Sequence, residues 1–166
     1  MRFRQLREDD YPVLIGRVDE WWGRPIAYML PRLFLRHFHA TSLAAVDDHG
    51  DVVGFLVGIV SPSEPGEAHT HFIAVSPDRR RDGLGRELYE AFFALARDRG
   101  CRTVTAVVSP VNTRSQRFHL AVGFLPVSLP DTNDAQDPTS GTGRELPVWQ
   151  DWDGPGEDRI RFRYAL

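Results

Sequence analysis

The feature that most constrains this chain is a glycine-rich turn between a β-rich run and an amphipathic helix. Phe72–Val75 is short, apolar and suited to a strand, and Ser76–Asp82 follows it as a polar turn. From Gly83 onward the apolar residues recur three or four positions apart, which predicts a helix, and Gly100 stands where a helix C-terminal glycine belongs. The sequence therefore predicts a strand, a glycine turn and a helix of about four turns.

The start of that helix has the chemistry of an anion site. The first amides of a helix have no partner within it, and the helix dipole adds partial positive charge there. Glycines at 83 and 85 would let a bulky anion approach the backbone, and the neighbouring arginines supply countercharge: Arg79, Arg80, Arg81 and Arg86. We expect this turn to receive a diphosphate. A Walker loop is excluded because no lysine follows the glycines, and a dinucleotide fingerprint is excluded because Leu88 stands in place of its third glycine.

The turn resembles the signature of the GNAT superfamily of N-acetyltransferases, which is Arg or Gln, two residues, Gly, one residue, then Gly or Ala. Arg80-Arg81-Asp82-Gly83-Leu84-Gly85 fits every position. Val75-Ser76-Pro77-Asp78 precedes it as in the family, and a second block from Asn112 to Phe124 follows at the expected distance. The resemblance covers roughly residues 67–125, and the combined pattern is more specific than either block alone.

The resemblance implies a single N-acetyltransferase domain over residues 1–166, of the α/β (α+β) class. The expected fold is a mixed, mostly antiparallel twisted sheet of about six or seven strands flanked by about four helices, with strands four and five splayed apart. Pro110 offers an independent reason for that splaying, because proline cannot donate to a strand ladder.

Residue patterns predict the order of the elements. The first half of the chain should contain a strand near Phe3–Leu6, a helix from Asp9–Asp10 to Trp21 or Trp22, an amphipathic helix over Ile26–Phe38 with Pro31 as its expected kink, and strands over 42–46, 52–60 and 68–75. The helix from Gly83 should be followed by a strand over 103–108, a short helix from 112 or 113 to 123, a long loop with a short strand around 145–149, and a strand over 160–165.

The resemblance also implies how acetyl-coenzyme A would bind as the acetyl donor. The amides of the Arg81–Arg86 turn would hold its pyrophosphate, and the backbone of Ile73 and Val75 would pair with its pantetheine arm. The cofactor-binding residues expected on this basis are Ile73, Val75, Arg80, Arg81, Asp82, Gly83, Leu84, Gly85, Arg86, Asn112 and Ser115. No metal site is expected.

Acyl transfer to an amine needs a deprotonated nucleophile, a polarised carbonyl and a proton for the departing thiolate. The resemblance implies direct attack in a ternary complex, with a backbone amide near Val75 polarising the carbonyl. A tyrosine that often protonates the thiolate is replaced here by His119. Two interpretations of His119 stay open. An imidazolium donates a proton more readily than a phenol, whose pKa is about 10, but the ring could also form a hydrogen bond in the cofactor groove without transferring a proton.

Two histidines are the candidate bases. His69 and His71 alternate on one predicted strand and therefore face the same side. Some histone-modifying relatives in the family carry a glutamate where this chain has His69, so the resemblance makes His69 the leading candidate. Deprotonation by water and backbone groups is the competing mechanism.

Two further groups of residues have a structural and a functional interpretation. The first two helices carry residues that either pack in the core or wall the acceptor site: Trp21, Trp22, Tyr28, Phe34 and His37. The late loop carries carboxylates that are either solvated or attract a cationic amine: Asp131, Asp134, Asp137, Asp151, Asp153, Glu157 and Asp158.

Charge and composition exclude several classes of protein. Twenty basic and 23 acidic side chains give a net charge of −3, so there is no basic field to hold nucleic acid. No apolar run approaches the roughly 18 residues of a membrane span, and Cys101 has no second cysteine for an internal disulfide. Together with the resemblance, which implies an acyltransferase that acts on a small-molecule amine or a peptide amine, these features predict a cytoplasmic protein without a membrane or nucleic-acid partner. The alternative is a non-catalytic sensor that binds acyl-coenzyme A. The acceptor and the oligomeric state stay open, although family members often form homodimers.

Overall fold

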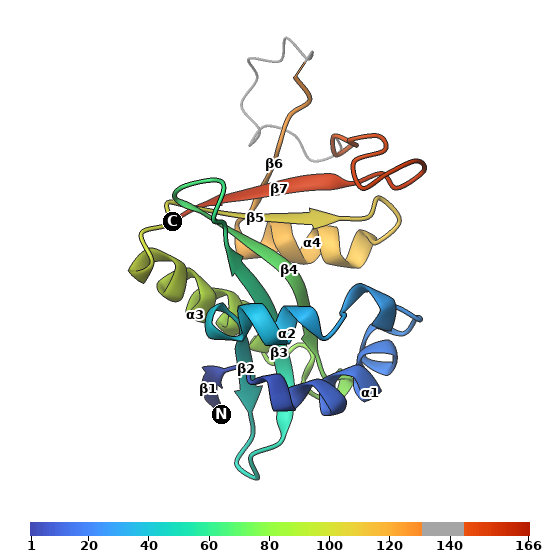
Figure 1. The fold of residues 1–166 in the computed structure, drawn as a ribbon. Helices are drawn as coiled ribbons and strands as arrows, with labels where there is room; N and C mark the ends of the chain where they lie inside the picture. Colours follow the sequence, from blue (N-terminus) through green and yellow to red (C-terminus); the bar gives the residue numbers. More distant parts are fainter. Residues whose placement is uncertain (131–144) are drawn as a thin grey trace. The chain divides into compact units, whose positions relative to one another are not determined.

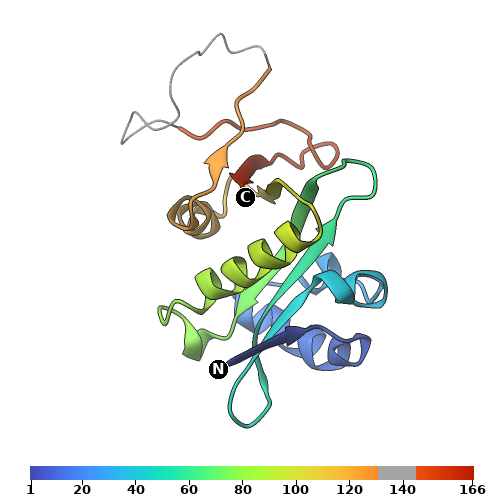
Figure 2. The ribbon, with the colours of Figure 1, turned by 90° about the vertical axis from the view of Figure 1, so that its left-hand side faces the viewer.

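The computed structural model describes residues 1–130 and 145–166, and the chain forms two compact units. The first unit comprises residues 1–102 together with Leu166, and the second comprises residues 103–165. Figure 1 and Figure 2 show the elements of both in two views. The expectation of one domain over residues 1–166 stays a prediction.

The first unit is built on a four-stranded antiparallel sheet in the order β1-β2-β3-β4. Its strands are β1 (Arg2–Gln5), β2 (Leu43–Val46), β3 (Val52–Val60) and β4 (Glu67–Val75). The Asp47 carboxylate closes the β2–β3 hairpin by accepting hydrogen bonds of 3.0 Å from the amides of His49 and Asp51. This side chain explains why an Asp- and Gly-rich segment forms the turn. The prediction that β2, β3 and β4 follow one another as antiparallel neighbours is confirmed.

Helices cover both faces of this sheet: α1 (Tyr11–Trp22) and α2 (Leu33–Phe38) cover one, and α3 (Leu84–Asp98) covers the other (Figure 2). Phe55 and Val57 of β3 belong to the core that α1 and α2 close. Gly54 and Gly58 alternate with them along the strand, and their nearest neighbours include side chains of α3. The predicted helix from Gly83 to the glycine at 100 is confirmed.

Gly58 allows α3 to lie close against β3. A Cβ at this position would stand 2.1 Å from a ring atom of Phe92 and 2.7 Å from the carbonyl oxygen of Thr41, so no other residue fits without movement. The Thr41 hydroxyl donates to the Gly58 carbonyl at 2.6 Å, and the Ser42 hydroxyl accepts from the Gly58 amide at 3.1 Å. The β3–β4 register also shifts between Val57 and Gly58, which marks a β-bulge at this point.

The predicted helix over Ile26–Phe38 is wrong, because the chain forms two pieces there. A single 3-10 turn covers Ala27–Met29, and α2 begins only at residue 33. Leu30 has φ −120° and ψ 62°, outside the helical region, as expected of a residue that precedes proline. The Asp19 carboxylate accepts from the amides of residues 26 and 27 at 2.7 Å each, so a side chain from α1 replaces helical partners.

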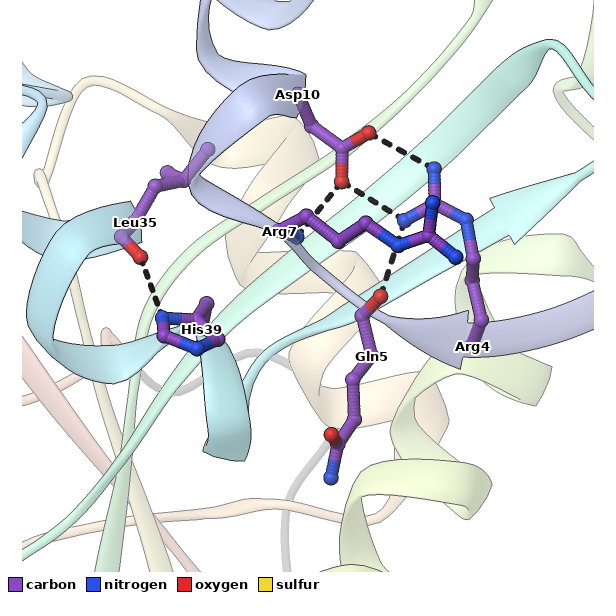
Figure 3. A network of polar contacts seen from close by, with 6 residues as sticks. All are labelled: Arg4, Gln5, Arg7, Asp10, Leu35 and His39. Atoms are coloured by element: carbon purple, nitrogen blue, oxygen red, sulfur yellow. Dashed lines mark hydrogen bonds and ion pairs between the residues drawn. The ribbon is translucent and has the colours of Figure 1, made fainter.

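A polar clasp joins β1 to the start of α1 (Figure 3). The Arg4 guanidinium donates two hydrogen bonds of 2.8 Å to the Asp10 carboxylate, which also accepts from the Arg7 amide at 2.8 Å. Burial alone would raise the pKa of Asp10, but the hydrogen bonds from Arg4 and Arg7 outweigh burial and lower it. The clasp therefore stabilises the folded chain when the Asp10 carboxylate is ionised.

The second unit contains β5 (Thr103–Val108), α4 (Thr113–Val122), β6 (Leu125–Pro126) and β7 (Ile160–Ala165). The strand order is β5-β7-β6 and both pairings are antiparallel. The prediction missed β6, which has two residues and includes a proline. The predicted short strand around 145–149 reduces to one isolated bridge between Trp149 and Arg159.

The α/β class and the predominance of antiparallel pairing are thus confirmed. The predicted splaying of strands four and five stays a prediction. No helix in the described part of the chain is long and apolar enough to cross a membrane.

Candidate functional site

The glycine turn before α3 adopts the backbone shape of an anion-binding loop. Gly83 is the N-cap of α3 and has a left-handed conformation, with φ 84°. Arg81 also has positive φ, at 73°, whereas Asp82 between them does not. Such alternation turns successive amides toward one concave side. A left-handed arginine costs roughly 1–2 kcal/mol, and strain of this kind gathers at functional sites.

The amides of this turn point to a ligand. Among residues 1–130 and 145–166, the structure shows no hydrogen bond donated by the amides of residues 81–85, whereas the next two amides both bond to the Gly83 carbonyl at 2.9 and 3.1 Å. A Cβ added at Gly83 would meet only the Glu87 carboxylate, at 3.9 Å, so no side chain plugs the helix start there. Five consecutive amides that donate no hydrogen bond within the described residues fit a diphosphate.

Arg80 serves the framework around the turn. Its guanidinium donates to the Trp21 carbonyl of α1 and to the Val75 carbonyl at the end of β4, the latter at 3.4 Å. These bonds tie the turn to both neighbouring elements. The countercharge role of Arg80 stays a prediction.

β4 carries the other candidates of the first unit. Burial alternates along the strand, so that one set of residues is half-buried and the other is buried. The half-buried set includes all four candidates: His69, His71, Ile73 and Val75. The backbone of Ile73 and Val75 lies opposite Leu56 and Gly54 of β3. The structure therefore brings the candidate bases and the predicted pantetheine residues together on one strand that leads into the glycine turn.

His71 is held by two contacts from the segment after α1. Its Nε2 lies 2.8 Å from the carbonyl oxygen of Met29, and its ring stacks on Phe34 with a centroid distance of 3.8 Å and an interplanar angle of 13°. Because a carbonyl can only accept, Nε2 carries the hydrogen and the lone pair of the neutral ring lies on Nδ1. Sequence reasoning named Phe34 as a wall residue but missed the Met29 carbonyl, since a backbone group leaves no sequence signal.

Other aromatic residues of the predicted acceptor wall divide between core and surface. Trp21 is buried and packs near Phe55, and Trp22 packs on Phe72 with a centroid distance of 4.8 Å. Tyr28 is 80% exposed. Core packing accounts for the two tryptophans.

The candidates of the second unit lie together on α4. Asn112 caps the helix, because its side-chain oxygen accepts from the Ser115 amide at 3.1 Å, as the sequence predicted for position 112 or 113. The Ser115 carbonyl in turn accepts from His119 Nδ1 at 2.8 Å. Cap, serine and histidine thus form one chain of hydrogen bonds along the helix. The cofactor-binding roles of Asn112 and Ser115 stay predictions.

His119 is 3% exposed and surrounded by aromatic rings. It stacks near Phe162 at 5.5 Å and meets the edges of Phe118 and Phe124 at 5.6 and 5.3 Å. Burial lowers the pKa of His119, and the hydrogen bond to the Ser115 carbonyl offsets only part of that effect. A neutral ring that forms hydrogen bonds is therefore favoured over an imidazolium acid, and the general-acid role stays a prediction.

The acidic late loop has local partners wherever the structure describes it. Asp131, Asp134 and Asp137 lie outside the described residues. Beyond them, the Arg159 guanidinium pairs with Asp153 at 2.6 Å and with Glu157 at 2.9 Å. The other two carboxylates accept backbone hydrogen bonds within the same loop: Asp151 from Gly156 and Asp158 from Asp151. Local structure therefore accounts for the four described carboxylates.

A cation–π stack between this loop and β7 had not been predicted. The Arg161 guanidinium lies 4.4 Å from the Trp149 ring centroid and 4.0 Å from that of Trp152. The two tryptophans stand three residues apart before a strand that alternates arginines, which is the signal that could have revealed the stack. Within the described residues, no cluster of three or more His, Cys, Asp or Glu could hold a metal ion.

The sequence is similar to a known protein family and to several named acetyltransferases. A model described as the acetyltransferase (GNAT) family matches residues 1–124. L-2,4-diaminobutyric acid acetyltransferase of Streptomyces coelicolor is 38% identical over 87 residues, which cover 52% of this chain and 51% of that protein. Mycothiol acetyltransferase of Saccharopolyspora erythraea is 33% identical over 82 residues, which cover 49% of this chain and 26% of that protein. The match thus spans about half or less of the length of these curated relatives.

A solved structure shares the fold over nearly the whole chain. Diaminobutyrate acetyltransferase EctA from Paenibacillus lautus was solved in complex with its substrate L-2,4-diaminobutyric acid and coenzyme A. It has a TM-score of 0.67 at 21% identity and covers 99% of this chain and 93% of that chain. At this identity the likeness shows the fold.

Proposed function

Because the chain belongs to the acetyltransferase (GNAT) family, we propose that it moves the acetyl group of acetyl-coenzyme A to a primary amine by direct attack in a ternary complex. Acetyl-coenzyme A supplies the acetyl group as an activated thioester. The observation that carries the proposal is the row of amides at residues 81–85, none of which donates a hydrogen bond within the described part of the chain. An anion with several oxygens satisfies such a row, and a diphosphate has the required size.

The donor would lie along the end of β4 and the start of α3. Amides of the turn would hold the diphosphate, with the left-handed Arg81 and Gly83 directing them. The pantetheine arm would pair with the backbone of Ile73 and Val75, the half-buried residues that precede the turn. The solved neighbour that carries coenzyme A on the same fold supports this assignment.

The proton of the acceptor amine would pass to a histidine of β4. His69 and His71 are both half-buried residues of β4, and His71 has a tautomer fixed by the Met29 carbonyl. The buried His119, with its lowered pKa, is the weaker candidate for a proton carrier. We therefore place the base on β4 and expect the departing thiolate to take its proton from solvent.

The acceptor would be a small molecule with a primary amine, and L-2,4-diaminobutyric acid is the first candidate. The S. coelicolor relative is named for this acceptor, and the P. lautus neighbour was solved with it. The mycothiol acetyltransferase relative, with a match of similar length, is named for a different acceptor. Peptide amines form the second class to test.

The test is thiol release from acetyl-coenzyme A by the purified protein, followed with a thiol-reactive dye. We expect release that depends on L-2,4-diaminobutyric acid or another small amine, together with micromolar binding of acetyl-coenzyme A in calorimetry. Binding without release for small amines and peptide amines alike would favour the sensor. Absence of both binding and release would contradict the proposal.

A further inference from the structure

The strongest unexplained feature of the first unit is the direction of His71. His71 and Phe72 are consecutive residues of β4, and side chains of consecutive strand residues normally point to opposite faces. Here both contact the layer formed by α1 and α2: His71 stacks on Phe34, and Phe72 packs on Trp22. Something in the strand has turned one of the two side chains.

The cause is the β-bulge between β3 and β4. Val57 lies opposite Phe72 and Gly58 lies opposite Thr70, so the extra residue on β4 falls at His71. A bulge re-aims a side chain, and bulges are frequent beside active sites for that reason. Gly58 lies on β3 beside this bulge, and only glycine fits there without movement because a Cβ would overlap Phe92. The bulge thus directs His71 toward α2.

Two contacts from the segment after α1 restrain the re-aimed ring. The Met29 carbonyl accepts from Nε2–H at 2.8 Å and leaves the lone pair of the neutral ring on Nδ1. Phe34 lies nearly parallel to the imidazole at 3.8 Å and so restricts rotation of the ring out of that plane. Met29 precedes the break at Pro31 and Phe34 follows it, so the interruption between the 3-10 turn and α2 brings a carbonyl and an aromatic face to the same ring.

We infer that Phe34 is a positioning residue for proton transfer to His71, an inference that rests on the proposed acetyltransferase function. The acceptor ammonium gives one proton to Nδ1 of His71, which becomes an imidazolium. The nitrogen lone pair forms the new N–C bond to the acetyl carbon, and the C–S bond breaks with its electron pair on the thiolate. The second proton of the amine nitrogen passes to solvent, and the thiolate takes a proton from solvent. The imidazolium of His71 then releases its proton to solvent.

The test compares substitutions at Phe34 with a matched control on the same helix. Phe38 lies one turn further along α2, is half-buried like Phe34, and pairs with Phe34 rather than with His71. The variants are Phe34→Leu, Phe34→Tyr and Phe38→Leu. Thiol release at saturating acetyl-coenzyme A and amine gives kcat, and ¹⁵N NMR at pH 8 reports the His71 tautomer, assigned with His71→Gln.

We expect Phe34→Leu to lower kcat roughly tenfold with little change in KM for acetyl-coenzyme A, because loss of orientation slows proton transfer and not donor binding. Its spectrum should show both tautomers, whereas the wild type shows the Nε2–H form. Phe34→Tyr, which retains a ring, and Phe38→Leu should keep kcat within about threefold.

Two outcomes overturn the inference while leaving the proposed function in place: an active wild type whose Phe34→Leu variant keeps its kcat, or an equal loss of kcat in Phe38→Leu. A wild type that binds acetyl-coenzyme A but acetylates none of the amines contradicts the proposed function, and with it the inference. An Nδ1–H tautomer in the wild type contradicts the assigned proton acceptor, whatever the rates.

Discussion

His71 in the first unit and His119 in the second differ in what surrounds a similarly restrained ring. Each has one nitrogen bonded to a backbone carbonyl, that of Met29 for His71 and that of Ser115 for His119. His71 is half-buried and stacked on Phe34, whereas His119 is 3% exposed among aromatic side chains. A fixed tautomer is therefore insufficient to identify a proton carrier. The ring must also be able to hold a charge, and burial makes that costly for His119.

The largest expected difference between the two histidines is in turnover. We expect His71→Gln to lower kcat by about 100-fold or more, because general-base catalysis contributes typically 10²–10⁴-fold. Glutamine keeps a donor for the Met29 carbonyl but cannot accept a proton at neutral pH. The measurement is thiol release at saturating substrates.

His69→Gln is the matched control for this loss, since His69 lies two residues earlier on β4 and is half-buried like His71. We expect a smaller decrease from it. A 100-fold loss in His69→Gln with near-normal turnover in His71→Gln would move the base to His69. Normal turnover in both variants would favour water-mediated deprotonation.

An intermediate effect should appear in the pH dependence of stability. The folded-state pKa of His119 is lowered from 6.5, so the unfolded chain binds a proton more readily than the folded chain. As pH falls below 6.5, the free energy of unfolding should therefore decrease, by at most about 1.4 kcal/mol per pH unit, until the folded-state pKa is reached. His119→Phe should remove this part of the decrease, measured by urea unfolding at pH 7.5 and pH 5.5.

Asp10→Asn provides the control for that measurement. The pKa of Asp10 is lowered from 3.8, so its contribution is present above that value and is lost as pH falls below it. The substitution should lower stability at both pH values, by about 1 kcal/mol for a partly exposed ion pair with good geometry, and leave their difference unchanged. An unchanged pH dependence in His119→Phe would show that His119 is not the group responsible.

The smallest expected effect is that of His119→Phe on turnover. Because the neutral, buried ring serves packing and a helix hydrogen bond, kcat should stay within about threefold of the wild type. A decrease of 100-fold in a folded variant would restore the general-acid interpretation. Circular dichroism of the variant would establish that it is folded.

Local sequence patterns predicted the elements whose shape depends on local contacts. The turn before α3, the helix that follows it and the β2–β3 hairpin all follow from glycine positions, apolar spacing and the Asp47 side chain. The helix cap at position 112 or 113 could also be predicted, because a capping side chain bonds to an amide only three residues further along the chain.

The rest depended on contacts distant in sequence. The helix predicted over Ile26–Phe38 is interrupted, and the Asp19 carboxylate from the preceding helix accepts hydrogen bonds from the amides of residues 26 and 27. The aim of His71 depends on strand register, and a pattern within one strand cannot reveal register. Burial of His119 depends on Phe162 of β7, so its lowered pKa could not be inferred from the helix alone.

The most direct test of the central claim compares two glycines at the two ends of α3. Gly83 and Gly100 have similar positive φ, 84° and 79°, and a Cβ at either meets no atom closer than 3.9 Å. Alanine at each imposes similar backbone strain, but only Gly83→Ala disturbs the amide row. We predict that Gly83→Ala lowers kcat/KM for acetyl-coenzyme A about tenfold, the effect of about 1.4 kcal/mol of strain, and leaves that for acetyl-pantetheine, which lacks the diphosphate, unchanged. Gly100→Ala should change neither value, and an equal loss with both donors in Gly83→Ala would contradict the account.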